Sequence, residues 1–200
     1  MQHGFLHLYI GDGKGKTTAA IGLAARAAGC GKQVVLGQFL KATRTGELAS
    51  LKMLGVTVIR SEKNLGFTWD MDGNELAVCR AEQALILERI KELFQATPRS
   101  GKRGVNFAPK PRSGPQGANA PKSPADILIL DELLDVLSLG LLDEEVLKAF
   151  LKGMPEELEL VLTGRSAPEW LTDSAGYITE MKKVKHPYDT GAQARQGIEY

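Results

Sequence analysis

The residues best suited to chemistry form a glycine- and lysine-rich run near the N-terminus. This run reads Gly-Asp-Gly-Lys-Gly-Lys-Thr-Thr from residue 11 and directly follows an apolar stretch at 5–10. Glycines let backbone N–H groups converge on one point, and a helix that starts there adds partial positive charge. The Lys16 ammonium can reach phosphate oxygens, and the Thr17 hydroxyl suits a Mg²⁺ ion that bridges them. The candidate phosphate-binding residues are therefore Gly11, Asp12, Gly13, Lys14, Gly15, Lys16, Thr17 and Thr18.

The spacing of this run separates it from two other glycine motifs. The common P-loop has one residue more between its first glycine and its Gly-Lys pair, which requires glycine at position 10, where this chain has Ile10. The G-x-G-x-x-G spacing of dinucleotide-binding loops is not met either. The alternative is a glycine turn with incidental lysines. The strand expected before the run and the helix expected after it favour the phosphate loop.

Two adjacent carboxylates, Asp131 and Glu132, follow the apolar run at 127–130. In an open parallel sheet, the carboxyl ends of the strands lie at the edge where ligands bind, which is also the edge that presents the phosphate loop. Hydroxyl and carboxylate oxygens are suitable ligands for Mg²⁺. We therefore expect Thr17 to share one metal ion with Glu132 or with Asp131. An acidic pair after a strand can also lack any such role, and the nearby phosphate loop is what favours the metal site.

Short apolar runs alternate with amphipathic stretches along the chain, which indicates a parallel sheet covered by helices. We expect an α/β fold of three layers, P-loop NTPase-like (RecA-like), with a mostly parallel sheet and helices on both faces. In the helix at 74–94, residues Ala77, Ala81, Ala84, Leu87, Ile90 and Phe94 recur at spacings of three and four. Strands are expected at 5–10, 33–39, 56–60, 126–130, 159–163 and 177–184, and helices at 17–28, 45–54, 74–94 and 143–153.

Residues 97–125 differ in composition from the rest of the chain. They contain six of the 25 basic residues, none of the 24 acidic ones, and many prolines and glycines. This composition predicts a flexible insertion on the surface of a single domain that spans residues 1–200. It is either a solvated linker or a basic flap that closes over bound phosphate or contacts a partner.

The overall composition is that of an ordinary globular protein, with 43% hydrophobic residues and a net charge of +1. Cys30 and Cys79 have no metal-ligand spacing, so we expect two reduced thiols. The N-terminus lacks the apolar stretch of a signal peptide, and no run is long enough to cross a bilayer. We therefore expect a cytoplasmic protein without a membrane or nucleic-acid partner.

Several short segments, in order along the chain, resemble the P-loop class of corrinoid adenosyltransferases. The resemblance covers nearly the whole chain apart from the insertion, and each segment on its own is weak. The segments are the shortened loop with Ala19-Ala20 after it, Gln38-Phe39-Leu40-Lys41, Gly66-Phe67-Thr68-Trp69-Asp70, Leu130-Asp131-Glu132-Leu133, Leu162-Thr163-Gly164-Arg165, and the tail from Val184 to Tyr200.

The resemblance implies an enzyme whose reduced cobalt(I) substrate attacks C5′ of ATP, so that triphosphate leaves. It also implies a homodimer, dependence on Mg²⁺ or Mn²⁺, and ATP bound in reverse across the loop. The corrinoid acceptor is then cobalamin, cobinamide or cobyrinic acid diamide, with a reduced flavoprotein as a reasonable electron donor. Lys16 and Thr17 become catalytic candidates, because they stabilise the charge that accumulates on the leaving triphosphate.

Phe67 and Trp69 gain a second role from this resemblance. Apolar rings beneath the corrin can expel the lower axial ligand of cobalt and so ease its reduction to cobalt(I). Residue statistics alone favour an ordinary core position, and the Gly-Phe-Thr-Trp context reverses that preference. Arg165 either binds phosphate or pairs with a surface acid, and both readings remain open.

Two other functions compete with adenosyl transfer. A P-loop kinase or NTP hydrolase could use Lys16, Thr17 and Asp131, and it would release ADP rather than triphosphate. A nucleotide-gated regulatory module would bind ATP without a corrinoid, and its partner complex would depend on the basic residues at 99–122.

Overall fold

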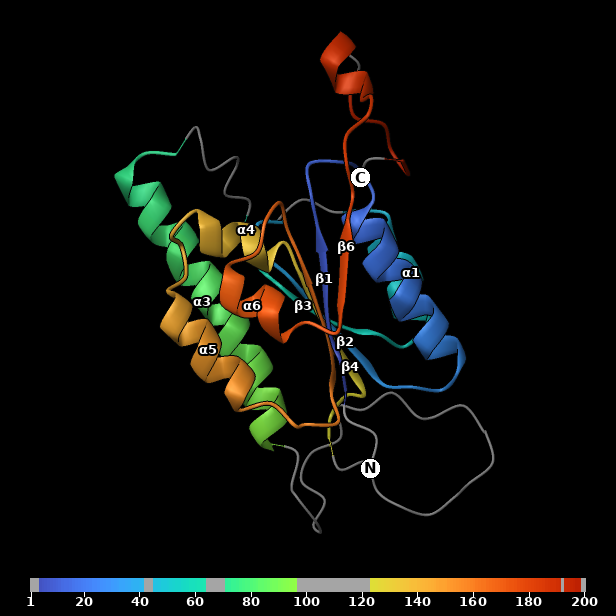
Figure 1. Cartoon of the computed structure of the whole chain (residues 1–200), viewed down its shortest axis with the longest axis vertical. Helices are drawn as coiled ribbons and strands as arrows, with labels where there is room; N and C mark the ends of the chain where they lie inside the picture. The colour runs from blue at the N-terminus through green and yellow to red at the C-terminus, as the bar shows by residue number, and fades with distance from the viewer. Residues whose placement is uncertain (1–3, 42–44, 64–70, 97–122, 192, 199–200) are drawn as a thin grey trace.

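The computed structural model describes residues 4–41, 45–63, 71–96, 123–191 and 193–198. Six strands form one sheet in the order β3-β2-β4-β5-β1-β6, and every neighbouring pair is parallel (Figure 1). All carboxyl ends therefore lie at the same edge of the sheet. The strands are β1 (Leu6–Ile10), β2 (Val34–Gln38), β3 (Thr57–Arg60), β4 (Ile127–Asp131), β5 (Glu159–Thr163) and β6 (Tyr177–Glu180).

Helices cover both faces of this sheet. Figure 1 shows α1 on one side and α3, α4, α5 and α6 on the other. Leu51 of α2 is buried in the same hydrophobic cluster as the alanines of α1, so α2 belongs to the α1 side. The predicted three-layer α/β fold is thereby confirmed. The helices are α1 (Lys16–Gly29), α2 (Glu47–Met53), α3 (Gly73–Ala96), α4 (Leu133–Ser138), α5 (Glu144–Lys152) and α6 (Glu169–Ser174), followed by a 3-10 turn at Pro187–Thr190.

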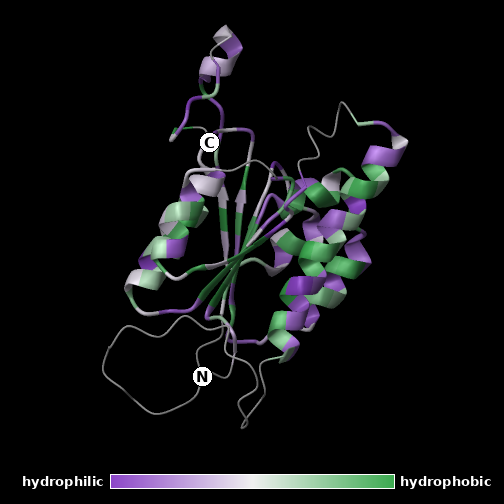
Figure 2. Ribbon diagram, turned by 180° about the vertical axis from the view of Figure 1, so that it is seen from behind, coloured by the Kyte–Doolittle hydropathy of each residue, from purple (hydrophilic) through white to green (hydrophobic). Residues whose placement is uncertain are grey.

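The core is built on β4, whose five residues are all buried. A strand covered on both faces reads as a continuous apolar run, as this one does up to its final aspartate. On one face, Ala20, Ala24 and Ala27 pack the α1 backbone close to the sheet. On the other face, larger aliphatic side chains of α3, α4 and α5 fill the space. Figure 2 shows the central strands as predominantly hydrophobic between the two helical layers.

The buried side of α3 agrees with the expected one in part: Leu87 and Ile90 are buried as expected, whereas the three alanines before them are not. Ala77, Ala81 and Ala84 are exposed, and the buried residues are Cys79, Gln83, Ile86, Leu87 and Ile90. Ala77, Ala81 and Ala84 recur at spacings of three and four, and so do Cys79, Gln83 and Ile86, so periodicity alone could not separate these two stripes. Because Gln83 is polar, the row of buried residues that contains it was not recognised from the sequence. Gln83 is buried because its Oε1 accepts a hydrogen bond from the backbone N–H of Leu40, at 3.0 Å.

Two further differences have local causes. The last strand was expected to continue to residue 184, but β6 ends at Glu180, whose partner in the ladder is Ile10 at the end of β1. No strand residue remains beyond that point for pairing. The helices α4 and α6 were not predicted, because six residues each are too few to establish a helical period.

The remaining expectations concern the chain as a whole. No helix within the described ranges combines the length and the apolar character that crossing a membrane needs. Cys30 is exposed, Cys79 is buried, and both are free thiols. Most of the expected insertion, at 97–122, lies outside the described residues. Ala125, at its predicted end, is buried in the core and so belongs to the body of the fold.

Candidate functional site

The glycine-rich loop connects β1 to α1 at the carboxyl edge of the sheet. Gly11 has a φ of 113° and Gly15 a φ of 125°, backbone conformations that L side chains rarely adopt. Gly15 is the N-cap of α1, so the helix begins at Lys16. The loop therefore ends at a helix N-terminus, where free N–H groups and the helix dipole favour an anion.

The same loop is packed against the segment that follows β6. The N–H of Gly13 donates to the carbonyl of Met181 at 2.7 Å, and the N–H of Lys183 donates to Oδ1 of Asp12 at 2.9 Å. This second bond lowers the pKa of Asp12. The Lys14 ammonium donates to the carbonyl of Ile198 at 2.8 Å. The C-terminal segment thus helps to hold the loop in shape, and the carboxylate of Asp12 has a structural partner.

We expect Gly13→Ala to weaken phosphate binding and to destabilise the fold. A Cβ at this position would lie 2.6 Å from the carbonyl oxygen of Met181, so one of the two backbones must move. Overpacking of this kind costs about 1–3 kcal/mol. Calorimetric titration with ATP and urea unfolding measure the two effects.

Gly22→Ala is the matched control for this change. Gly22 lies within α1, and a Cβ there meets no atom within 4 Å. Alanine in a helix interior is favoured over glycine by roughly 0.5–1 kcal/mol, so this variant should be as stable as the parent or more so. Equal ATP affinity in both variants and the parent would show that the close approach of Met181 does not shape the loop.

The Lys16 side chain folds back over its own loop. Its Nζ donates to the carbonyls of Gly11 at 2.7 Å and Gly13 at 3.0 Å. These two carbonyls provide acceptors for the ammonium group within the loop itself. A phosphate that enters the loop can take over the same donor, because charge-assisted hydrogen bonds to an anion are stronger than those to neutral carbonyls.

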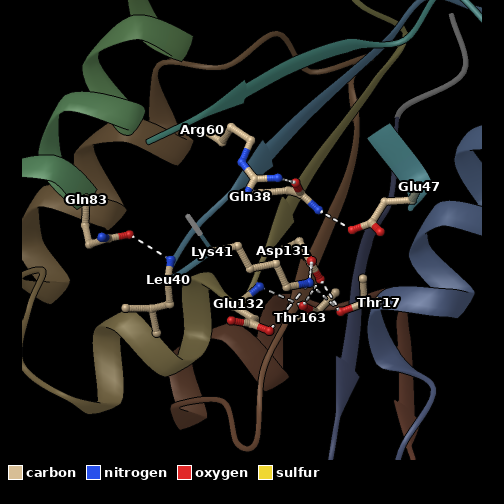
Figure 3. Close-up of polar contacts among 10 residues, drawn as sticks. All are labelled: Thr17, Gln38, Leu40, Lys41, Glu47, Arg60, Gln83, Asp131, Glu132 and Thr163. Atoms are coloured by element: carbon tan, nitrogen blue, oxygen red, sulfur yellow. Dashed lines mark hydrogen bonds and ion pairs between the residues drawn. The ribbon is translucent and has the colours of Figure 1, made fainter. Parts of the chain in front are cut away.

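The predicted hydroxyl and carboxylates do meet at this edge. Thr17 donates to Oδ1 of Asp131 at 3.0 Å, although 114 positions separate the two residues (Figure 3). Thr163 donates to the same oxygen at 2.8 Å and accepts the N–H of Glu132 at 2.8 Å. Thr163 can do this because β5, which it ends, lies between β1 and β4. Asp131 itself is fully buried.

Lys41 completes this group and was not predicted as a site residue. Its Nζ lies 2.6 Å from Oδ2 of Asp131, 3.2 Å from the Thr17 hydroxyl and 3.5 Å from Oε1 of Glu132 (Figure 3). Burial alone lowers a lysine pKa, but the two carboxylates more than offset it, so the pKa of Lys41 is raised. Burial raises the pKa of Glu132, despite the opposing effect of Lys41.

A second polar group lies beside Lys41. Gln38, at the end of β2, is fully buried; its amide donates to Glu47 at 3.0 Å and accepts from Arg60 at 3.2 Å (Figure 3). In the ladder, Gln38 is the register partner of Asp131. The carboxyl ends of β2, β3 and β4 are therefore joined by polar contacts. The sequence signal for Gln38 and Lys41 was their place at and just after the end of an apolar strand.

The oxygens around Lys41 form a donor set that suits a hard cation. Hydroxyl and carboxylate oxygens are the ligands that Mg²⁺ takes, and the ammonium group shows that a cation is stabilised among them. Among the described residues there is no cluster of three or more His, Cys, Asp or Glu that could hold a metal. A metal here needs phosphate oxygens or waters to complete its shell, as Mg²⁺ in nucleotide sites normally does.

The other predicted residues are placed as follows. Thr18 is exposed in the first turn of α1. The carbonyl of Arg165 accepts the N–H of Gly11 at 3.0 Å, its own N–H donates to Oδ1 of Asp135 at 2.9 Å, and the residue is exposed. The backbone of Arg165 thus adjoins the loop. Phe67 and Trp69 lie outside the described residues.

Comparison with known proteins gives one consistent result. The family model described as "ATP:corrinoid adenosyltransferase BtuR/CobO/CobP" matches residues 2–200. A corrinoid adenosyltransferase of Escherichia coli is 32% identical over 203 residues, covering 100% of this chain and 87% of the relative. The corrinoid adenosyltransferase CobA of Salmonella typhimurium is 32% identical over 200 residues, with the same coverage. A corrinoid adenosyltransferase of Pseudomonas aeruginosa is 30% identical, and this chain covers 85% of its length.

Proposed function

Because the chain belongs to the ATP:corrinoid adenosyltransferase BtuR/CobO/CobP family, we propose that it transfers the 5′-deoxyadenosyl group of ATP to the cobalt(I) of a corrinoid and releases triphosphate. This step belongs to the formation or salvage of adenosylcobalamin. The observation that carries the proposal is the meeting of the phosphate loop, Thr17 and the Asp131–Glu132 pair at one sheet edge, in a chain that matches the family over its full length.

The chemistry explains why a phosphate site serves an alkyl transfer. When cobalt attacks C5′ of the ribose, the C5′–O bond breaks and its electrons pass to the triphosphate. Donors aimed at this leaving group stabilise the transition state. Lys16 and the N–H groups at the start of α1 supply such donors.

We assign direct metal binding to Thr17 and Glu132. Asp131 supports them by accepting the hydrogen bond of Thr17. Because Thr17 donates its proton to Asp131, its hydroxyl oxygen acts as an acceptor, and the position that now accepts from Lys41 can serve Mg²⁺ or Mn²⁺ instead. Oδ1 of Asp131 already accepts from two threonines, whereas the Glu132 side chain is 31% exposed and freer to bind metal directly. The ion, when bound, offsets the charge of the departing triphosphate.

Removing either carboxylate should raise the metal concentration that half-maximal activity requires. We expect Glu132→Ala to have the larger effect, because it removes the direct ligand, and Asp131→Ala to act through Thr17. Mg²⁺ titration of the initial rate measures both. Glu144→Ala, an exposed glutamate of α5, is the control and should match the parent. Unchanged titrations in both site variants would reject this placement.

Phe67 and Trp69 are proposed to lie against the corrin and to displace the lower axial ligand. Apolar walls disfavour water at cobalt, since a water placed there loses hydrogen bonds that it has in bulk. We expect Phe67→Ala and Trp69→Ala to impair turnover from cobalt(II) with a reduced flavoprotein as donor. Both variants should largely retain turnover when cobalt(I) is supplied ready-made, because the ATP site is untouched.

Electron paramagnetic resonance of the bound cobalt(II) corrinoid provides the second readout. The parent should contain a four-coordinate species, and the two variants less of it. Equal losses in both assays, with the coordination unchanged, would assign these rings to the core instead.

An anaerobic assay with ATP and chemically reduced corrinoid tests the proposal as a whole. Cobalamin, cobinamide and cobyrinic acid diamide are compared as acceptors, and the light-sensitive spectrum of the cobalt–carbon bond reports the product. Triphosphate as the co-product supports adenosyl transfer, whereas ADP and phosphate would indicate a kinase or hydrolase. We further propose that the enzyme works in the cytoplasm as a homodimer.

A further inference from the structure

Lys41 occupies the position at the sheet edge where the proposed metal belongs. Its ammonium lies within 3.5 Å of all three groups assigned to metal binding: Thr17, Asp131 and Glu132. The side chains of Lys41 and Asp131 are only 18% and 1% exposed. Such a position is costly for a charged lysine unless an anion pairs with it, and equally for the carboxylates unless a cation does.

The ammonium and a divalent metal cannot use these oxygens together. Mg²⁺ binds oxygen at about 2.0–2.1 Å, so a metal bound to Thr17 and Glu132 would lie within the contact distance of Nζ. Two cations that close repel each other strongly in a partly buried site. When a metal ion binds there, the Lys41 ammonium must therefore move away. A triphosphate bound at the neighbouring phosphate loop provides anionic oxygens with which the ammonium can pair.

The backbone that leads into Lys41 is anchored by two hydrogen bonds. The N–H of Leu40 is fixed by the buried Gln83, and the N–H of Phe39 donates to the carbonyl of Asp131 at 3.0 Å. Leu40 and Glu132, with φ of 52° and 64°, are the only non-glycine residues with positive φ in the described part of the chain. Strained residues of this kind persist where the surroundings over-determine them. Here they flank Lys41 and Asp131.

We propose that Lys41 is a positioning residue that acts as a built-in counter-cation, holding Thr17, Asp131 and Glu132 in place for the metal and exchanging with it when the metal–nucleotide complex binds. This inference rests on the proposed metal site. The exchange makes metal binding weak without nucleotide, because the ammonium competes for the same oxygens. With ATP present the competition is relieved, because Lys41 gains phosphate oxygens as partners.

The test measures Mn²⁺ binding to the nucleotide-free protein by electron paramagnetic resonance. We expect Lys41→Met and Lys41→Gln to bind Mn²⁺ about tenfold more tightly than the parent or better, since they remove the competing charge. Lys41→Arg keeps the charge and should remain as weak as the parent. Lys63→Met is the control, because Lys63 pairs with Glu82 at 2.7 Å on α3 and makes no contact at the metal site among those described.

Two further measurements locate the gained site and guard against unfolding. Adding Glu132→Gln to Lys41→Met should abolish the gain in Mn²⁺ affinity. The melting temperature of Lys41→Met should fall below that of the parent without metal and rise more than the parent's when Mn²⁺ is added. Mn²⁺ affinity within twofold of the parent, or no added thermal response, would overturn the proposal. These readouts use neither ATP nor corrinoid, so failure of the adenosyl-transfer assay leaves them interpretable.

Discussion

Turnover should fall on the order of a hundredfold or more when Lys16 is replaced by alanine. Removing one charge-assisted donor from a developing anion costs roughly 2–4 kcal/mol of transition-state stabilisation. The Lys16 ammonium lies against its own loop, where it donates to the carbonyls of Gly11 and Gly13. Steady-state kinetics with chemically supplied cobalt(I) and saturating ATP separate this effect from the reduction of cobalt(II) and from the binding of ATP.

Lys14→Ala is the matched control for this loss. Lys14 belongs to the same loop, but its ammonium donates to the carbonyl of Ile198 in the C-terminal segment. We therefore expect a much smaller effect on turnover. Comparable losses in the two variants, or near-normal turnover in Lys16→Ala, would contradict the role assigned to Lys16. Circular dichroism and melting curves establish that both variants are folded.

The second large effect concerns stability. Asp131→Ala should lower the free energy of unfolding by about 3 kcal/mol or more, the usual cost of removing one partner of a buried ion pair. The change leaves the Lys41 ammonium and the hydroxyls of Thr17 and Thr163 without their shared acceptor. Urea unfolding at neutral pH, in the absence of metal and nucleotide, measures the loss.

A double-mutant cycle separates the ion pair from simple truncation. The Asp131→Ala/Lys41→Met variant should recover part of the loss, because it no longer contains a largely buried ammonium that has lost its 2.6 Å partner. Asp143→Ala is the control, since Asp143 is exposed at the N-cap of α5 and its side chain makes no capping hydrogen bond. It should change stability by less than about 0.5 kcal/mol. Additive losses in the cycle would show that Lys41 and Asp131 are not energetically coupled.

Features that depend on neighbours along the chain could be predicted from residue types. A strand, a glycine turn and a helix N-terminus follow one another between residues 6 and 29, so this local arrangement could be predicted from residue types. Each strand of the sheet was likewise predicted from its own residues, although the last one ends at Glu180 rather than at residue 184. Parallel strands share one carboxyl edge, and this alone brought Thr17 and Asp131 into the same prediction.

Which groups meet at that edge, and in what arrangement, depends on how the strands pack into the sheet. Lys41 pairs with Asp131 across 90 positions because β2 lies next to β4, and Thr163 reaches Asp131 because β5 separates β4 from β1. Strand order is a property of the packed sheet and cannot be predicted from residue types. The same holds for Gly13, whose need for glycine comes from Met181 in a distant segment.

The buried face of α3 shows the physical reason most clearly. Two stripes of the helix satisfy the same period, and the exposed one contains only small alanines. The choice between them came from packing, because the larger side chains of Ile86 and Ile90 bury more apolar surface against the sheet. Gln83 is buried beside them because its side chain accepts a hydrogen bond from the N–H of Leu40. Local periods follow from residue types along the chain, whereas the partner of each buried group is set by elements that the chain brings together from far apart.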